Sequence, residues 1–144
     1  MRLAVRAVIL REGRLLIVNA WPGRTHLWCC PGGGAEDHAS LPENLAREVH
    51  EETGLRVTVG APCLVNEFHD PGRFHQMEVF FRCEATGETA DDWEDPERVV
   101  VARRWVDEAE AQEMVRAKAL RPASLPNIAW GSGVGYDALE PIIR

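Results

Sequence analysis

The sequence predicts a mixed α/β fold (α+β), an α/β/α sandwich in which helices cover both faces of a mixed β-sheet. Short apolar runs rich in β-branched residues recur along the chain, and two segments between them carry helix-capping signals. No internal repeat or low-complexity linker divides the 144 residues, a length usual for one domain. We therefore expect a single domain over 1–144, with a tail from about 120 to 144 that the sequence does not specify.

The first strands are predicted to form a hairpin. Residues 3–10 and 15–19 are apolar, β-branched runs, and Gly13 between them supplies the backbone freedom of a tight turn. A short strand over 27–30 precedes a loop over 31–34, whose three glycines allow sharp turns and close backbone approach. Further strands are expected where apolar residues alternate or cluster, at 56–59, 64–68, 77–82 and 99–106.

A helix is predicted directly after the glycine loop. Ser40 followed by Glu43 has the spacing of a capping box, and Gly54 has the position of a C-terminal glycine cap. These two signals predict a helix over 41–53.

A second helix is predicted near the C-terminus. Asp107 with Glu110 repeats the capping-box spacing, and a modest apolar stripe follows it, so we expect a helix over 107–119. Beyond that point the chain is rich in Pro and Gly, and a short helix is expected around 137–143.

Composition and charge exclude several classes of protein. The net charge of −7 argues against a large nucleic-acid interface, which would need clustered Lys and Arg. No run approaches the roughly eighteen apolar residues of a membrane helix, and the first ten residues resemble a strand rather than a signal peptide. We therefore expect a cytoplasmic protein without membrane contact. The four cysteines show neither disulfide nor zinc spacing and are expected to be buried thiols.

The predicted helix over 41–53 carries three glutamates on one face. Glu48, Glu51 and Glu52 stand at i, i+3 and i+4, an arrangement that repels itself unless a cation is present. Mg²⁺ and Mn²⁺ prefer such oxygen ligands and also bridge to substrate phosphates. The alternative is a solvated acidic face in which Arg47 pairs with neighbouring glutamates.

The glycine loop before this helix suits a phosphate ligand. Gly33 and Gly34 leave backbone N–H groups open to approach beside the acidic helix, and such groups bind polyphosphates. A glycine run alone is weak support for that function.

Together, the loop and helix resemble the Nudix box, G-x5-E-x7-R-E-U-x-E-E-x-G-U, where U is aliphatic. The chain departs from this motif once, because Ala39 stands where the first glutamate belongs, although Glu36 and Asp37 lie nearby. The positions that match are Gly33, Arg47, Glu48, Val49, Glu51, Glu52, Gly54 and Leu55.

The resemblance implies a Nudix-like sandwich and a metal-dependent hydrolase. In such enzymes the positions of Glu48, Glu51 and Glu52 bind Mg²⁺ or Mn²⁺, and that of Arg47 orients the carboxylates as structural support. The implied reaction is hydrolysis of a pyrophosphate linkage in a nucleoside diphosphate joined to a group X, such as ADP-ribose or an NTP. The implied partner is therefore a small nucleotide-like molecule.

The general base and the phosphate-binding cations stay open at this point. The base is Glu51 or Glu52 of the helix, or Glu94 or Glu97 of the acidic loop over 91–97. Substrate phosphates are expected to meet the glycine loop and an arginine. The candidate arginines are Arg6, Arg24 and Arg73, although the sequence favours an ordinary surface role for each of them.

Two other functions compete with hydrolysis. Ala39 is also what a non-catalytic nucleotide sensor descended from such enzymes would show, and a structural domain with a solvated acidic helix is the third class. Pro71, sixteen residues beyond Leu55, resembles the spacing of the ADP-ribose-cleaving branch, but an Asp-Pro-Gly turn explains it as well. Whether the chain forms a homodimer is left open.

Overall fold

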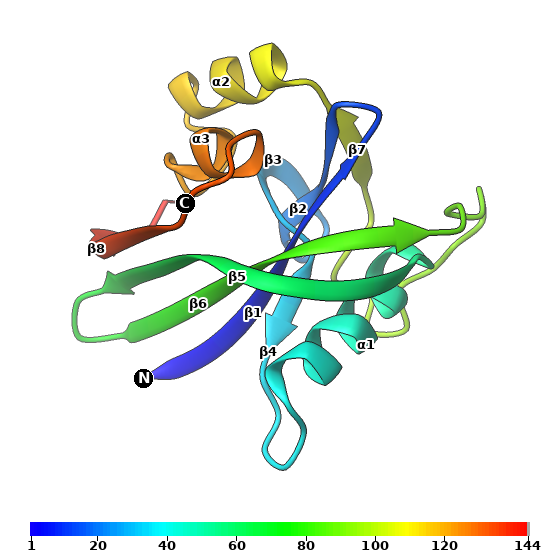
Figure 1. Cartoon of the computed structure of the whole chain (residues 1–144). Helices are drawn as coiled ribbons and strands as arrows, with labels where there is room; N and C mark the ends of the chain where they lie inside the picture. Colours follow the sequence, from blue (N-terminus) through cyan, green and yellow to red (C-terminus); the bar gives the residue numbers. More distant parts are fainter. Residues whose placement is uncertain (144) are drawn as a thin grey trace.

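A computed structural model describes residues 1–143 and begins with the predicted hairpin (Figure 1). Strands β1 (Arg2–Arg11) and β2 (Arg14–Trp21) pair antiparallel. Between them Glu12 and Gly13 both have positive φ, 52° and 75°. A two-residue turn of this kind matches the twist of the strands that it joins.

The sheet combines parallel and antiparallel pairs, as predicted. The long strands β5 (Arg56–Asp70) and β6 (Phe74–Thr86) are antiparallel, while β1 runs parallel to β6. The strand order is β3-β2-β1-β6-β5-β8, with β4 beside β1 and β7 beside β2. The remaining strands are β3 (Arg24–Cys29), β4 (Gly32–Gly34), β7 (Arg103–Val106) and β8 (Gly135–Pro141).

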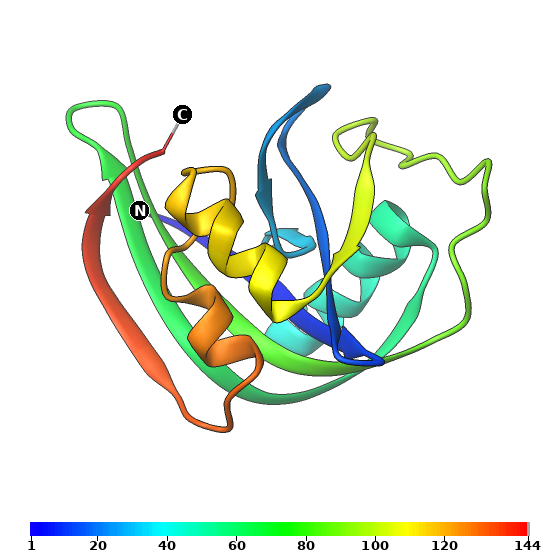
Figure 2. The same ribbon diagram turned by 90° about the horizontal axis from the view of Figure 1, so that it is seen from above.

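Helices cover both faces of the sheet, which confirms the predicted sandwich (Figure 2). On one face, Val5 of β1 belongs to a core cluster with Leu45 and Val49 of α1 (Leu41–Thr53). On the other face, Val8 joins a cluster with α2 (Glu108–Arg116) and α3 (Leu125–Ala129). Successive side chains of a strand point to opposite faces, so β1 contributes to both cores.

Both predicted helix starts are confirmed by their caps. The Ser40 hydroxyl accepts a hydrogen bond from the Glu43 backbone N–H at 3.1 Å. At the other end of α1, Gly54 has a φ of 76°, which only glycine adopts readily. Asp107 and Glu110 form the full reciprocal capping box, although α2 ends at 116 rather than at 119.

Four sequence expectations are corrected by long-range pairing. The glycines at 32–34 form strand β4 rather than a loop, because they pair with β1. The runs at 56–59 and 64–68 belong to one strand, β5, whose register is irregular at Pro62, a residue without an N–H donor. The run at 99–106 is a strand only from 103, and residues 101 and 102 instead donate to the Asn19 side chain.

The fourth correction is the C-terminal segment. The helix expected at 137–143 is wrong, since β8 pairs parallel with β5 as an edge strand. Asn66 fixes this strand by donating to Asp137 and Glu140, at 2.8 and 3.1 Å. An exposed edge strand buries too few side chains to leave an alternating pattern in the sequence. The residues before it are integral to the fold, because Leu120 and Leu125 are buried in the core.

The cysteines agree with the expectation of buried thiols. All four cysteines are free and buried. Within residues 1–143, none of the helices has the length and apolarity required to cross a bilayer.

Glu78 of β6 is the centre of a buried ionic network. Its two carboxylate oxygens accept from Arg6 Nε at 2.6 Å and from Arg121 Nη2 at 2.7 Å. Burial alone would raise the pKa of Glu78, but the two guanidinium groups lower it to about 2. The network joins β1, β6 and the segment after α2.

We predict that Glu78 makes the fold sensitive to acid. Its folded-state pKa lies below the ordinary value of 4.5, so its contribution to the free energy of unfolding is lost as pH falls from about 4.5 toward 2. Glu78→Gln leaves two buried arginines without a counter-ion and should cost roughly 3–5 kcal/mol at neutral pH. Urea unfolding across this pH range measures both effects, with the exposed Glu84→Gln as control. An unchanged pH slope in Glu78→Gln would contradict the assignment.

Candidate active site

Helix α1 places Glu48 and Glu52 against the glycine strand β4, whereas the side chain of Glu51 contacts Arg47. Glu48 and Glu52 are only 9% and 6% exposed. The alternative of a solvated acidic face is therefore wrong for these two residues. Burial of like charges is costly unless something compensates it.

Arg47 lies among the carboxylates of the same helix. Its Nη1 approaches Glu48 Oε1 at 3.3 Å and Glu51 Oε1 at 3.5 Å. Its Nη2 donates to Asn44 Oδ1 and lies 3.6 Å from Glu36. The structure thus places Arg47 where it can orient the carboxylates without blocking every oxygen.

The glycines of β4 allow the strand to contact the helix directly. Gly32 N–H donates to Glu52 Oε2 at 3.1 Å. A Cβ at Gly33 would fall 2.8 Å from the carboxylate carbon of Glu48. A side chain at position 33 would displace that carboxylate, whereas a Cβ at Gly32 would fall 1.9 Å from the Val5 carbonyl oxygen, so space requires glycine at position 32.

Burial changes the titration of Glu52. Burial raises the pKa of Glu52, Arg6 and the Gly32 N–H lower it, and the nearby Glu48 raises it. The net result is a pKa of about 8. Without a cation, this carboxyl therefore keeps its proton at neutral pH.

Glu48 is affected in the same direction. Burial raises its pKa, Arg47 lowers it, and the charges of Glu51 and Glu97 raise it. The effect of Glu97 shows that the later acidic loop lies close to α1.

A cavity of about 420 Å³ opens between α1, β4, β1 and the segment after β6. Its lining combines carboxylates with two guanidinium groups, those of Arg2 and Arg6 of β1. Its charged and glycine lining residues are Arg2, Arg6, Gly32, Gly33, Gly34, Glu36, Glu48, Glu52, Asp95 and Glu97.

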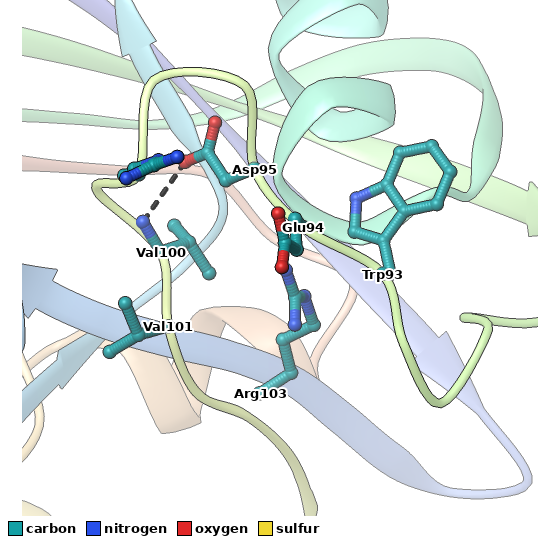
Figure 3. A pocket seen from close by; sticks show the side chains of 7 residues that line it. Trp93, Glu94, Asp95, Val100, Val101 and Arg103 are labelled. Atoms are coloured by element: carbon teal, nitrogen blue, oxygen red, sulfur yellow. Dashed lines mark hydrogen bonds between the residues drawn. The ribbon is translucent and has the colours of Figure 1, made fainter.

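The structure separates the two candidate glutamates of the acidic loop. Glu97 lines the cavity with Glu48 and Glu52, whereas Glu94 lines a neighbouring cavity of about 390 Å³ (Figure 3). The chain bends between these two glutamates, at the buried Asp95, whose carboxylate accepts hydrogen bonds from the N–H groups of Glu97 and Val100, both at 2.9 Å.

Two of the three candidate phosphate-binding arginines do not line the cavity of the carboxylates. Arg24 lines a separate cavity beside Trp21, and Arg73 is exposed in the turn between β5 and β6. Arg6, one of the three arginines considered from the sequence, does line the cavity, together with Arg2, which the sequence analysis missed. No local signal marks Arg2, because its position depends on the pairing of β1 with β4 and β6.

The carboxylates fit a hard divalent cation as a partial ligand set. Within residues 1–143, no three His, Cys, Asp or Glu side chains converge as a complete metal cage. However, Glu51 Oε2 is buried and has no hydrogen-bond partner. Mg²⁺ usually takes one or two carboxylates and completes its shell with water and substrate phosphates.

Comparison with known proteins establishes the family. The family model described as the NUDIX domain matches residues 1–130, most of the chain. The chain therefore belongs to the NUDIX domain family.

Two curated relatives match about three fifths to two thirds of the chain. YjhB of Bacillus subtilis (strain 168), which bears the provisional name of an ADP-ribose pyrophosphatase, is 32% identical over 92 residues, or 59% of this chain and 43% of that protein. Diphosphoinositol polyphosphate phosphohydrolase 2 of Rattus norvegicus is 31% identical over 97 residues, 66% of this chain and 50% of that protein. The chain thus spans about half the length of these relatives.

Solved structures share the fold. A NUDIX hydrolase from Nitrosomonas europaea superposes with a TM-score of 0.72 at 17% identity, covering 98% of this chain and 79% of that one. The ORF135 protein of E. coli has a TM-score of 0.67 at 26% identity, covering 90% and 86%. These likenesses confirm the predicted Nudix-like sandwich.

We predict that Glu52 destabilises the cation-free protein at alkaline pH. The folded state holds a proton that the unfolded state loses between 4.5 and about 8, so stability falls as pH rises across this range. Each unit of rise in pH lowers the free energy of unfolding by up to about 1.4 kcal/mol. Glu52→Gln should remove this slope in unfolding experiments with EDTA, and the exposed Glu43→Gln of the same helix should keep it. Equal slopes in all three proteins would refute the assignment.

Proposed function

We propose that the chain is a Mg²⁺- or Mn²⁺-dependent hydrolase that cleaves a pyrophosphate linkage in a nucleoside diphosphate joined to a group X, such as ADP-ribose or an NTP. The observation that carries this proposal is the pair of buried carboxylates, Glu48 and Glu52, which line one cavity together with Arg2 and Arg6. A cation and a diphosphate in this cavity would neutralise both kinds of charge. The name of the Bacillus subtilis relative agrees with this substrate class.

The cation would be held by the glutamates of α1. Glu48, Glu51 and Glu52 are the proposed ligands, and Arg47 keeps Glu48 and Glu51 oriented. When bound, a divalent ion neutralises phosphate charge and lowers the pKa of a water molecule.

The phosphates would lie against the glycine and arginine residues of the lining. Backbone N–H groups of the glycine strand and the guanidinium groups of Arg2 and Arg6 face the cavity and can bind phosphate oxygens. Arg6 is already held in place by Glu78 and by the Cys30 carbonyl, so it would bind phosphate without losing side-chain freedom.

A carboxylate must take the proton of the attacking water as the phosphate oxygen of the leaving group departs. We propose Glu97 for this step, with Glu52 as the alternative. Glu97 lines the same cavity, is exposed to solvent, and comes from a segment other than the ligand helix. It is thus free to act while the α1 glutamates hold the cation.

The charge of the cavity favours a nucleotide over an inositol pyrophosphate, the substrate class in the name of the rat relative. The cavity is lined by two arginines and by five carboxylates, namely Glu36, Glu48, Glu52, Asp95 and Glu97. One diphosphate with its cations suits this balance. A ligand carrying many further phosphates would meet too few cations.

Glu36 is proposed to replace the missing glutamate of the box. It lies 3.6 Å from Arg47 and lines the cavity, whereas Ala39 is exposed. Glu36→Gln should lower kcat/KM by roughly tenfold, because support of a ligand set is typically worth that much. The neighbouring exposed Asp37→Asn is the matched control and should keep wild-type kinetics. If both variants behave alike, Glu36 has no such role.

The proposed function is tested by product formation from ADP-ribose, NADH, diadenosine polyphosphates, nucleotide sugars, NTPs and an inositol pyrophosphate, with Mg²⁺, Mn²⁺ or EDTA. Cleavage of one nucleotide class only with a cation is expected. Glu52→Gln should lose nearly all turnover while staying folded, and Glu43→Gln should not. Cation-linked nucleotide binding without turnover would instead favour a sensor, the function to which Ala39 points.

A further inference from the structure

The C-terminal end of α1 is capped by side chains from one distant segment. The last four carbonyls of a helix have no partner within the helix. Here His50 O accepts from Gly54 N at 2.8 Å, which closes the first of them. The other three accept from side chains between the end of β6 and the first residue of β7: Glu51 O from Trp93 Nε1 at 3.0 Å, Glu52 O from Arg103 Nε at 2.5 Å, and Thr53 O from Thr89 Oγ1 at 2.7 Å.

Trp93 is also packed tightly on the end of the helix. A Cβ at Gly54 would fall 3.0 Å from its indole ring, and its edge contacts the His50 ring at a centroid distance of 5.3 Å. Figure 3 shows Trp93 standing beside the α1 ribbon while the chain bends at Asp95. The segment is therefore attached to the helix by both packing and hydrogen bonds.

The same segment carries Glu97, the proposed base. Residues 87–102 pair with no strand among residues 1–143, and the backbone hydrogen bonds of Trp93 and Arg98 are local, to Ala90 and Asp95. Asn19 of β2 holds the part beyond Glu97: its Nδ2 donates to the Val99 carbonyl at 2.9 Å, and its Oδ1 accepts from the N–H groups of 101 and 102. Glu97 thus lies between an attachment to β2 and the contacts of Trp93 and Arg103, and those two contacts join its segment to α1.

Arg103 is suited to this place by charge as well as by hydrogen bonding. A cation near the C-terminus of a helix interacts favourably with its dipole. The Arg103 backbone pairs with Val18 of β2, and its side chain is directed to the helix by the Nε contact with Glu52 O, while its Nη2 atom is buried without a hydrogen-bond partner.

We infer that Trp93 and Arg103 are positioning residues that fix the segment over 89–103 on the carbonyl end of α1 and thereby hold Glu97 opposite the glutamates of the helix. This inference rests on the proposed hydrolase function. The carbonyls used belong to Glu51 and Glu52 themselves, so the backbone that carries the cation ligands also anchors the base. Small displacements of a reacting group cost large factors in rate.

The test is Trp93→Phe, which keeps an aromatic ring but removes the N–H donor. The matched control is Trp130→Phe, because Trp130 Nε1 donates to the Gly13 carbonyl at 2.9 Å, far along the chain from the site. We expect Trp93→Phe to lower kcat by about tenfold or more while KM changes by less than about twofold, since binding groups are untouched. Trp130→Phe should keep wild-type kcat.

Hydrogen exchange provides a readout that does not depend on turnover. Amides over 88–100 should exchange faster in Trp93→Phe than in wild type or Trp130→Phe, while amides of α1 and β6 keep their protection. Arg103→Met should act in the same way. The double variant should lose less activity than the product of the two single losses, because both residues hold one segment.

Three outcomes would overturn the inference: an unchanged kcat in Trp93→Phe, an equal loss in Trp130→Phe, or unchanged exchange of the segment. If the wild-type protein cleaves no substrate, the proposed function fails by that result. Faster exchange in Trp93→Phe would then still establish the anchor but would overturn its link to catalysis.

Discussion

The close contact between the glycine strand β4 and helix α1 is the constraint on which the site depends. The Glu48 carboxylate lies against the strand, in the space that a side chain at Gly33 would occupy, and the Gly32 N–H donates to Glu52. The two carboxylates are buried in this way, and burial raises the pKa of Glu52 to about 8. Two carboxyl groups are thus buried close together, which lowers the free energy of unfolding. A bound divalent cation would offset this cost.

The charges around this contact are arranged in layers. The buried Glu78 fixes Arg6 and Arg121 and keeps its own charge. Arg6 is therefore held in one orientation in the lining of the cavity that Glu48 and Glu52 also line. The segment that carries Glu97 lines the same cavity, and it is attached to α1 through Trp93. Glu78 and Trp93, which do not line this cavity, thus hold residues that do.

The sequence correctly predicted those parts of the fold that depend on interactions between residues close together in the chain. The helix over 41–53 is confirmed because Ser40 and Gly54 cap it within one turn. Strand β4 and the contribution of Arg2 were missed, because both depend on pairing with residues far along the chain. The choice between Glu94 and Glu97 also could not be made from composition, since the bend set by Asp95 decides which one faces the cavity. The edge strand β8 buries too little to leave a pattern, and its Ala, Leu and Glu residues favour a helix by propensity.

The most direct test of this account is a calorimetric titration with Mn²⁺ in the absence of substrate, comparing wild type with Glu52→Gln and with the exposed Glu43→Gln. The account predicts that wild type and Glu43→Gln bind the ion with the same affinity, and that Glu52→Gln binds it at least about tenfold more weakly. Equal affinity in all three proteins, or no binding by the wild type, would show that the buried carboxylates of α1 are not held for a cation.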